Sequence, residues 1–332
     1  MSSNPIEPRN QGWQVTVPAT SANLGCAFDC AGLALRLYLK ASFVPLDASE
    51  LTVEYAGRHP ERVPLDGSNL VLEALRFAAA NMGAPPPRGH VALQSDIPVG
   101  AGLGSSAAAV VAGVLLGASH SAGCLSPNGM PDPEKLIGWT QHLEGHFDNA
   151  AAALFGGLVF GWNDSGRIRT IKTAFPENLK LILVVPEAMV RTSEARRVLP
   201  QSYSRSDALH NLQRAAMLAA SCFSGRFDFT PEMFDDRLHH PFRQELVPGI
   251  ARCLEYRHPN LRGIAIGGSG PSVIAIAEQN ENRIALDLQA IFAGEGLASE
   301  TIVTSADNQG AVIVPRPAPV PQFADIARGA KV

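Results

Sequence analysis

A glycine-rich stretch with two serines, residues 98–108, is the part of the chain whose residue types best suit chemistry. It reads Pro-Val-Gly-Ala-Gly-Leu-Gly-Ser-Ser-Ala-Ala, and small apolar residues continue after it. Glycine adopts positive φ angles and lets the backbone approach a ligand closely. Residues 107–116 predict a buried helix whose first amide groups add to those of the loop. We therefore expect the loop and the helix to surround an anion, and we expect that anion to be phosphate.

Other glycine-rich loops offer alternatives for this stretch. A Walker A loop needs Lys after its last glycine, whereas Ser105 follows Gly104 here. Residues 102–107 loosely fit the dinucleotide fingerprint, but that motif also needs an acidic residue about 20 positions later. No Asp or Glu occurs between Asp96 and Asp132, which disfavours a dinucleotide. A tight turn that leads into a core helix, without a ligand, is the alternative for a lone loop of this kind.

A turn-rich segment near the start of the chain carries a second group of candidates. Residues 17–34 contain Asn23 and Asp29, and Asp29 is the only charged residue among them. Asn and Asp are common in turns because their side chains hydrogen-bond to nearby backbone groups. The Asp29 carboxylate can also form an ion pair with the amine of a substrate.

A third group lies in residues 142–149, which read His-Leu-Glu-Gly-His-Phe-Asp-Asn. Two histidines four residues apart suit zinc, but the H-E-x-x-H order is absent and Gly145 interrupts the helix. Glu144 suits Mg²⁺, which takes a carboxylate together with phosphate oxygens and water. A solvated glutamate and a hydrogen-bonded core histidine are the alternative to both metals.

Two arginine-bearing segments and a second glycine-rich turn complete the candidates. Arg191 and Arg196 follow a predicted buried strand, and an arginine there can grip a carboxylate with two hydrogen bonds. A helix surface of mixed charge is the alternative. Residues 239–243, His-His-Pro-Phe-Arg, allow the same two interpretations. Residues 267–272, Gly-Gly-Ser-Gly-Pro-Ser, predict either a tight connection or a backbone wall against a ligand.

Strand and helix patterns alternate irregularly along the chain, which indicates an α+β fold rather than a doubly wound sheet. We expect strands over residues 14–18, 33–45, 51–55, 90–95, 155–162, 168–173, 179–185, 264–267, 273–277 and 311–314. We expect helices over residues 69–82, 107–116, 134–154 with a break near Gly145, 208–222, 241–256 with an interruption at Pro248, and 283–295. A boundary between two parts of the chain is expected near residues 165–178.

Composition excludes several classes of protein. Hydrophobic residues make up 46% of the 332 residues and charged residues 17%, which suits a real core and argues against disorder. The net charge is −4 and no basic patch dominates, so we expect neither nucleic acid nor a membrane surface as a partner. The first 15 residues lack an apolar targeting segment, so we expect a cytoplasmic protein. The five cysteines form no C-x-x-C pair, which favours packed thiols over disulfides or a metal site.

Taken together, these segments resemble the GHMP family of small-molecule kinases. Residues 18–32 are similar to its P-A-S-S-A-N-L-G-P-G-F-D motif, and residues 98–108 match its ATP-binding P-x-x-x-G-L-G-S-S-A-A motif nearly letter for letter. Residues 267–272 resemble its S-G-A-G-P-S motif. Two further segments, residues 144–149 and 192–200, are similar to the branch of the family that phosphorylates the side-chain hydroxyl of L-homoserine, a step toward threonine.

The resemblance implies a two-domain α+β fold. An N-terminal ATP-binding domain, residues 1–170, would contain a left-handed β-α-β unit. A C-terminal domain, residues 171–332, would be ferredoxin-like. The resemblance also implies ATP and Mg²⁺ as cofactors, a small amino-acid substrate and a homodimer.

The resemblance further implies a role for each candidate residue. The ATP-binding residues would be Asn69, near the nucleoside, and Pro98, Gly100, Gly102, Leu103, Gly104, Ser105, Ser106 and Ala107. Ser105 or Ser106 would hold Mg²⁺ together with Glu144. The catalytic residues would be Glu144, Asp148 and Asn149. The substrate would contact Asn23, Asp29, His146, Thr192, Arg196, Arg243, Gly268 and Ser269, with its amine on Asp29 and its carboxylate on Arg196 and Arg243.

Three alternatives remain for the function. A kinase of the same family could act on mevalonate, a sugar or an isoprenoid precursor, although mevalonate offers no amine for Asp29. A catalytically silent ligand sensor should have lost the magnesium carboxylate or a loop serine, and both are present. A nicotinamide dehydrogenase lacks its ribose-binding acid.

Overall fold

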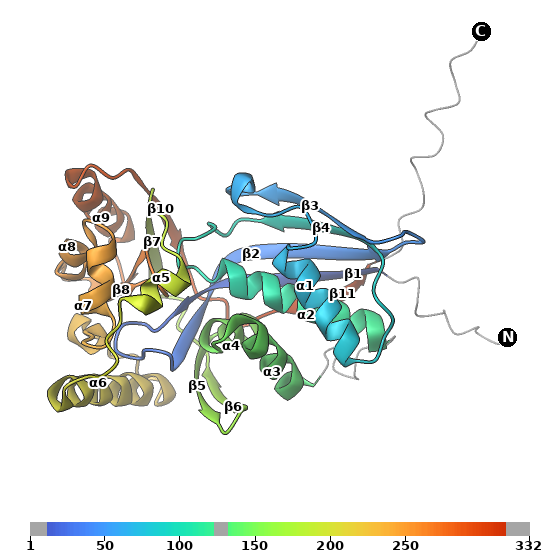
Figure 1. The fold of residues 1–332 in the computed structure, drawn as a ribbon. Coiled ribbons are helices and arrows are strands. Elements are labelled where there is room, and N and C mark those ends of the chain that lie inside the picture. The colour runs from blue at the N-terminus through green and yellow to red at the C-terminus, as the bar shows by residue number, and fades with distance from the viewer. Residues whose placement is uncertain (1–11, 123–131, 317–332) are drawn as a thin grey trace, which may run out of the picture.

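The computed structural model describes residues 12–122 and 132–316, which form two sheets with helices around them (Figure 1). The first sheet has the strand order β11-β1-β2-β4-β3, and the β5–β6 hairpin joins it through β2. Its strands are β1 (Gly12–Ala22), β2 (Ala31–Pro45), β3 (Leu51–Gly57), β4 (Gly89–Ser95), β5 (Leu158–Asp164), β6 (Arg167–Thr173) and β11 (Val312–Arg316). Only β3 and β4 run parallel, and α1 connects them. This is the expected β-α-β unit, and the left-handed sense of its connection stays a prediction.

Four helices accompany the first sheet: α1 (Leu70–Asn81), α2 (Ser105–Ala122), α3 (Pro133–Glu144) and α4 (Asp148–Phe155). The buried helix predicted over residues 107–116 is confirmed as the central part of α2. Its glycines let α1 approach closely, because a Cβ at Gly113 would lie 2.3 Å from the carbonyl oxygen of Val71. The predicted break at Gly145 is also confirmed, since that residue ends α3 with a φ of 80°. This break turns the chain so that α4 begins beside α2, which the two helices' contacts confirm.

The second sheet is fully antiparallel, with the order β10-β7-β9-β8. Its strands are β7 (Lys180–Pro186), β8 (Leu261–Ile266), β9 (Val273–Ala277) and β10 (Ser299–Thr304). Helices α5 (Thr192–Arg197), α6 (Arg205–Phe223), α7 (His240–Arg243) and α8 (Ile250–Leu254) lie between β7 and β8, and α9 (Glu281–Gly294) lies between β9 and β10. Short 3-10 turns occupy Pro60–Arg62, Pro231–Phe234 and Gln244–Leu246. This connection order and strand order are those of the expected ferredoxin-like domain.

Alternating residues of the second sheet belong to two different cores. Leu181 and Leu183 of β7 pack into the core of the first sheet. Ile182 and Val184, on the opposite face, pack with residues of α8 and α9. This alternation follows from the period of two along a strand, and it fixes the second sheet against the first.

Some elements differ from the sequence-based expectation. The expected helix over residues 241–256 is three short helical turns, because Pro248 and Gly249 interrupt it. Strand β10 was not predicted; it lies at an edge of its sheet, where its residues are only partly buried and show no clear alternation. The division of the chain at residues 170/171 stays a prediction, and β11 crosses it by returning to pair with β1.

Within the described part of the chain, we find no helix with the length and apolar character needed to cross a membrane.

Candidate active site

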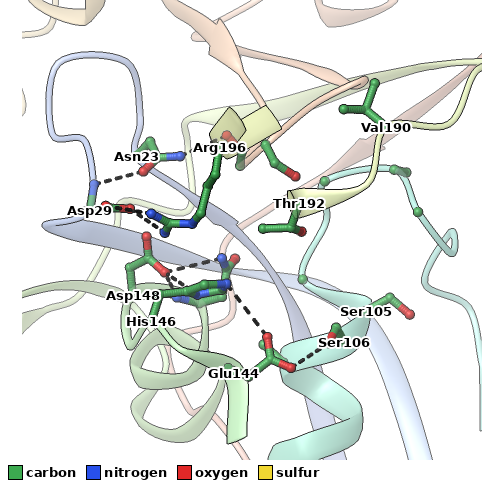
Figure 2. A pocket seen from close by; sticks show the side chains of 18 of the residues that line it. Asn23, Asp29, Ser105, Ser106, Glu144, His146, Asp148, Val190, Thr192 and Arg196 are labelled. Atoms are coloured by element: carbon green, nitrogen blue, oxygen red, sulfur yellow. Dashed lines mark hydrogen bonds and ion pairs between the residues drawn. The ribbon is translucent and has the colours of Figure 1, made fainter. Parts of the chain in front are cut away.

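A polar cavity lies where the two sheets and their helices meet (Figure 2). Its walls come from the turn after β1, the loop before α2, the start of α4, helices α5 and α7, and the turn between β8 and β9. The lining residues are Asn23, Asp29, Gly100, Ala101, Gly102, Gly104, Ser105, Ser106, Ala107, Glu144, His146, Asp148, Asn149, Val190, Thr192, Arg196, Arg243, Gly268 and Ser269. Segments separated by up to 246 positions, from Asn23 to Ser269, therefore share one cavity.

The two glycine-rich turns pack backbone against backbone beside this cavity. Gly102 has a φ of 75°, and a Cβ there would lie 2.2 Å from the carbonyl oxygen of Gly267. Gly268 has a φ of 55°, and its Cβ would lie 2.6 Å from the carbonyl oxygen of Gly102. A Cβ at Gly104 would lie 1.9 Å from Oγ1 of Thr20. The glycines of the loop are thus required by packing as well as by any approach of a ligand.

Glu144 and Ser106 form the acidic edge of the cavity. The Ser106 hydroxyl donates to Oε1 of Glu144 at 2.5 Å, and Oε2 lies 3.9 Å from Nε2 of His146. The Glu144 side chain is 8% exposed, and this burial raises the pKa of its carboxyl above the usual value. The charged form of a carboxylate that is buried in this way is strongly stabilised by a nearby cation.

His146, Asp148 and Asn149 form a hydrogen-bonded group at the start of α4. Nδ1 of His146 lies 3.2 Å from Oδ1 of Asp148, and this contact raises the pKa of the imidazole. The Asn149 backbone N–H donates to the same carboxylate oxygen at 2.7 Å. Thr20 donates to Oδ1 of Asn149 at 2.8 Å, which turns the amide nitrogen of Asn149 toward Asp148. Asp148 is therefore held by its neighbours, and its carboxylate faces His146.

Asp29 and Arg196 face each other across the opposite side of the cavity. The guanidinium donates to both carboxylate oxygens, at 2.9 and 3.1 Å. Asp29 adopts a positive φ of 53°, and its backbone N–H donates to Oδ1 of Asn23 at 3.0 Å. Both charged side chains are 39% exposed, so they remain accessible from the cavity. The two residues predicted to hold opposite ends of a substrate thus form an ion pair with each other.

Arg243 closes the same end of the cavity from α7. It is 3% exposed, and burial lowers the pKa of its guanidinium. Its hydrogen bonds go to the carbonyl oxygens of Ala195 and Gly268 and to Nδ1 of His239, and Asn23 also donates to Gly268. No carboxylate is among the hydrogen-bond or ion-pair partners of Arg243 within the described residues. A buried cation without a counter-ion favours an anionic ligand.

A second, more apolar cavity adjoins the glycine loop and shares Gly100, Ser105 and Ser106 with the first. Its other walls are Leu39, Tyr55, Arg62, Val63, Pro64, Asn69, Leu70, Val71, Leu93, Ser95, Val99 and Ala109. Asn69 itself caps α1, because its side chain accepts from the Val71 N–H and donates to the Pro64 carbonyl. An apolar cavity beside a glycine-rich loop suits a flat heterocycle joined to phosphates.

The structure brings nearly all the predicted site residues together. Asn69 lines the adjoining cavity, while Pro98 and Leu103 are buried and line neither cavity. Sequence analysis missed Thr20, which orients Asn149, and the wall residues Ala101 and Val190. Thr20 lies inside the first motif, but nothing in the sequence tells which distant side chain its hydroxyl reaches.

The expected metals can be tested against these donors. Ser106 and Glu144 are hard oxygen donors at one edge of the cavity, and Mg²⁺ commonly binds one or two carboxylates together with substrate phosphates. These residues therefore fit Mg²⁺, and of the two loop serines Ser106 makes the contact with Glu144. Among the residues that the structure describes, no three His, Cys, Asp or Glu side chains cluster as a metal site. His142 is exposed and stacks on Phe77, which does not support zinc.

Comparisons with known proteins identify relatives of this chain. The family model described as GHMP kinases N terminal domain matches residues 69–157. A homoserine kinase of Solibacter usitatus is 37% identical over 302 residues, which cover 91% of this chain and 97% of that protein. A homoserine kinase of Deinococcus radiodurans is 36% identical over 94% of this chain and 98% of its own length. The crystal structure of a homoserine kinase from Cytophaga hutchinsonii superposes with a TM-score of 0.79 at 24% identity, over 95% of this chain and 100% of that one, which shows a shared fold.

Proposed function

The chain belongs to the homoserine kinases of the GHMP family, and from this premise we propose how its cavity carries out their reaction. The protein transfers a phosphoryl group from ATP to the side-chain hydroxyl of L-homoserine, which yields O-phospho-L-homoserine and ADP.

One observation carries the proposal: a site for a zwitterion adjoins a site for phosphates. Asp29, Arg196 and Arg243 offer one negative and two positive groups at one end of the cavity. The glycine-rich loop of residues 100–107 lies at the other end. An α-amino acid carries one ammonium and one carboxylate, so its charges match Asp29 and the two arginines. Its side chain would then extend toward the loop.

Residues at the phosphate end would bind and neutralise ATP. The loop amides and the first turn of α2 would donate to phosphate oxygens. Ser106 and Glu144 would hold Mg²⁺, which when bound supplies positive charge that stabilises the phosphoryl oxygens. The apolar cavity around Tyr55, Val63 and Leu70 would hold the nucleoside.

Residues between the two ends would orient the acceptor hydroxyl. Phosphoryl transfer passes through a loose transition state, so positioning and charge neutralisation account for most of the catalysis. The Asn149 amide is fixed by Thr20 and by Asp148, and it would hydrogen-bond to the hydroxyl. The carboxylate of Asp148 would accept the hydroxyl proton or keep His146 in place.

The alternative substrates fit these charges less well. Mevalonate carries a carboxylate but no amine, so it would offer no ammonium group to Asp29. A silent sensor would not need the Ser106–Glu144 pair, which is present. The paired carboxylate and guanidiniums therefore favour an amino acid.

An assay of ADP release tests this function. Purified protein, ATP and Mg²⁺ would be incubated with L-homoserine, L-threonine or mevalonate in parallel. We expect release with L-homoserine at a kcat/KM at least about 100-fold above that with mevalonate, because mevalonate lacks the ammonium group that Asp29 would bind. Equal rates with mevalonate, or no release with L-homoserine, would contradict the proposal.

The homodimer implied by the family resemblance is also proposed. Light scattering after size-exclusion chromatography would give about twice the mass of the 332-residue chain if it is correct. The cytoplasmic location expected from the sequence stays a prediction.

A further inference from the structure

His239 is a buried histidine beside the substrate end of the cavity, and the proposed roles above do not use it. Its side chain is 0% exposed and does not line the cavity. It stacks on Phe28, with ring centroids 5.0 Å apart, and the Arg243 guanidinium lies 5.2 Å from the same Phe28 ring. His239 and Arg243 are thus packed together on one aromatic side chain.

The hydrogen bonds of His239 define its protonation. Nε2 lies 3.0 Å from the carbonyl oxygen of Gly25. A carbonyl oxygen only accepts, so Nε2 carries the proton and donates it. Nδ1 then has a free lone pair, and it faces the Arg243 guanidinium at 3.4 Å. Burial lowers the pKa of His239, which keeps the ring neutral and leaves Nδ1 able to accept.

Asp236 fixes the backbone that carries His239. Its buried carboxylate accepts from the N–H groups of His239 and His240, each at 2.7 Å, and from Leu238 at 3.2 Å. The amide of Asn211 on α6 donates to the other carboxylate oxygen at 2.6 Å. A carboxylate with this many donors is firmly oriented, so the first turn of α7 is held in place.

The same residues also anchor the turn that bears Asn23 and Asp29. His239 binds the carbonyl of Gly25, and Asn211 donates to the carbonyl of Cys26 at 3.1 Å. One buried group therefore contacts both the arginine of α7 and the turn that carries the opposite charge.

We propose that His239, Asp236 and Asn211 form a positioning network that presents Arg243 and the 23–29 turn to the amino-acid substrate. The network touches neither the glycine loop nor the Ser106–Glu144 pair. It sets the affinity for the amino acid and leaves ATP binding and the transfer step unchanged. The inference rests on the proposed function, because it assigns the amino acid to this end of the cavity.

Two variants of His239 separate its two hydrogen bonds. H239Q places an amide donor near the position of Nε2, which keeps the Gly25 contact and removes the acceptor for Arg243. H239N places an amide near the position of Nδ1, which keeps the acceptor and removes the Gly25 contact. H240Q is the matched control: His240 is also buried, but its Nε2 accepts from the Ile266 N–H instead of contacting Arg243.

KM for L-homoserine, KM for ATP and kcat would be measured for each variant, with thermal unfolding to establish folding. We expect H239Q to raise KM for L-homoserine about tenfold, the effect of one hydrogen bond to a charged group. KM for ATP and kcat should stay within about threefold of the parent chain. H239N should raise the same KM to a smaller extent, and H240Q should leave it unchanged.

Three outcomes would overturn the network. The first is an unchanged KM for L-homoserine in a folded H239Q protein. The second is an equal rise of KM for L-homoserine in H240Q. The third is a parallel fall of kcat and of ATP affinity in H239Q. The second and third outcomes would indicate that His239 has a merely structural role. If the parent chain does not phosphorylate L-homoserine, the proposed function fails instead; calorimetric binding of L-homoserine to the parent and to H239Q then tests the network separately.

Discussion

Asp29 and Arg196 belong to different motifs, 167 positions apart, and the structure joins them in a bidentate ion pair. The motifs predicted that both residues lie in one site. They could not predict that the two charges neutralise each other, because a motif carries no distances. Binding of an amino acid would replace this one ion pair with two, one at each end of the zwitterion. The pair would therefore keep Asp29 and Arg196 neutralised by each other until the substrate arrives, whereas Arg243 remains without a carboxylate partner among the described residues.

Replacing Arg196 with alanine tests this role. We expect R196A to raise KM for L-homoserine about tenfold to 100-fold, because a charged hydrogen-bond partner of the carboxylate is lost. KM for ATP should change little, since Arg196 lies at the opposite end of the cavity. R197A is the control: Arg197 follows directly in α5, is exposed and does not line the cavity. Steady-state kinetics would be measured for both variants. Equal increases in KM for L-homoserine would contradict a specific role of Arg196 and would indicate a non-specific effect of the positive charge on α5.

The two loop serines make a second residue-scale prediction. Ser106 contacts Glu144, whereas Ser105 does not. We expect S106A and E144Q to lower kcat by about 100-fold or more, as the loss of a metal ligand in phosphoryl transfer would. S105A should lower kcat much less. Circular dichroism would show whether each variant is folded, and the Mg²⁺ dependence of kcat would show whether affinity for the metal changed. Equal kcat values for S105A and S106A would contradict the assignment.

At the scale of the elements, most helices and strands could be predicted from periodicity and from glycine and proline positions. The capping residue Asn69, the break at Gly145 and the interruption near Pro248 all come from local backbone chemistry. β10 could not be predicted, because an edge strand with no clear alternation has no strong pattern. The six-residue helix α5 is too short to show helical periodicity, so the sequence offers a surface helix there only as an alternative.

The glycines of the loop were predicted to let a ligand approach, and the structure adds a packing reason. We expect G102A to destabilise the protein by at least ~2 kcal/mol, since its Cβ would meet backbone atoms that cannot move easily. G100A is the matched comparison. Its Cβ would meet only the flexible Met189 side chain, so the cost should be the ~1 kcal/mol of a left-handed alanine. Urea unfolding of both variants measures the difference, and equal losses would show that packing between the two turns is unimportant.

At the scale of the whole molecule, the cavity exists because two sheets with a shared core bring their turns together. The sequence predicted the fold class and the ferredoxin-like second sheet through family resemblance. It could not predict the backbone contact between residues 102 and 267–268, nor the network of α6 and α7 behind Arg243, because both depend on how the two sheets pack. The pairing of β11 with β1 in the first sheet likewise could not be predicted from the sequence.

Buried histidines make the stability of the molecule depend on pH. Burial lowers the pKa of His120, His239 and His240 below the ordinary histidine value of 6.5. Below pH 6.5 the unfolded chain therefore binds protons that the folded chain does not, and stability falls as the pH falls. His146 acts in the opposite direction, because its raised pKa stabilises the fold below pH 6.5 and this gain is lost as the pH rises. Glu144 acts in the same direction as His146, because its pKa is also raised. The three buried histidines outnumber these two groups, so we expect a net loss of stability between pH 6.5 and 5.

Thermal unfolding of the parent chain and of H240Q from pH 8 to pH 5 measures this effect. We expect the parent to lose stability below pH 6.5 more steeply than H240Q. The slopes of the unfolding free energy against pH should differ by the equivalent of up to about one bound proton. H142Q, at an exposed position, should follow the parent. A parent chain whose stability is constant down to pH 5 would contradict the neutral state assigned to the buried histidines.

In the proposed function, one cavity holds the phosphates of ATP on the loop of residues 100–107 and L-homoserine between Asp29 and the two arginines. A crystal structure of the protein with a non-hydrolysable ATP analogue, Mg²⁺ and L-homoserine is the decisive test. We expect phosphate oxygens on the loop amides, the metal beside Ser106 and Glu144, and the amino acid with its ammonium on Asp29 and its carboxylate on Arg196 and Arg243. A nucleotide bound elsewhere, or an amino acid whose carboxylate lies away from both arginines, would contradict it.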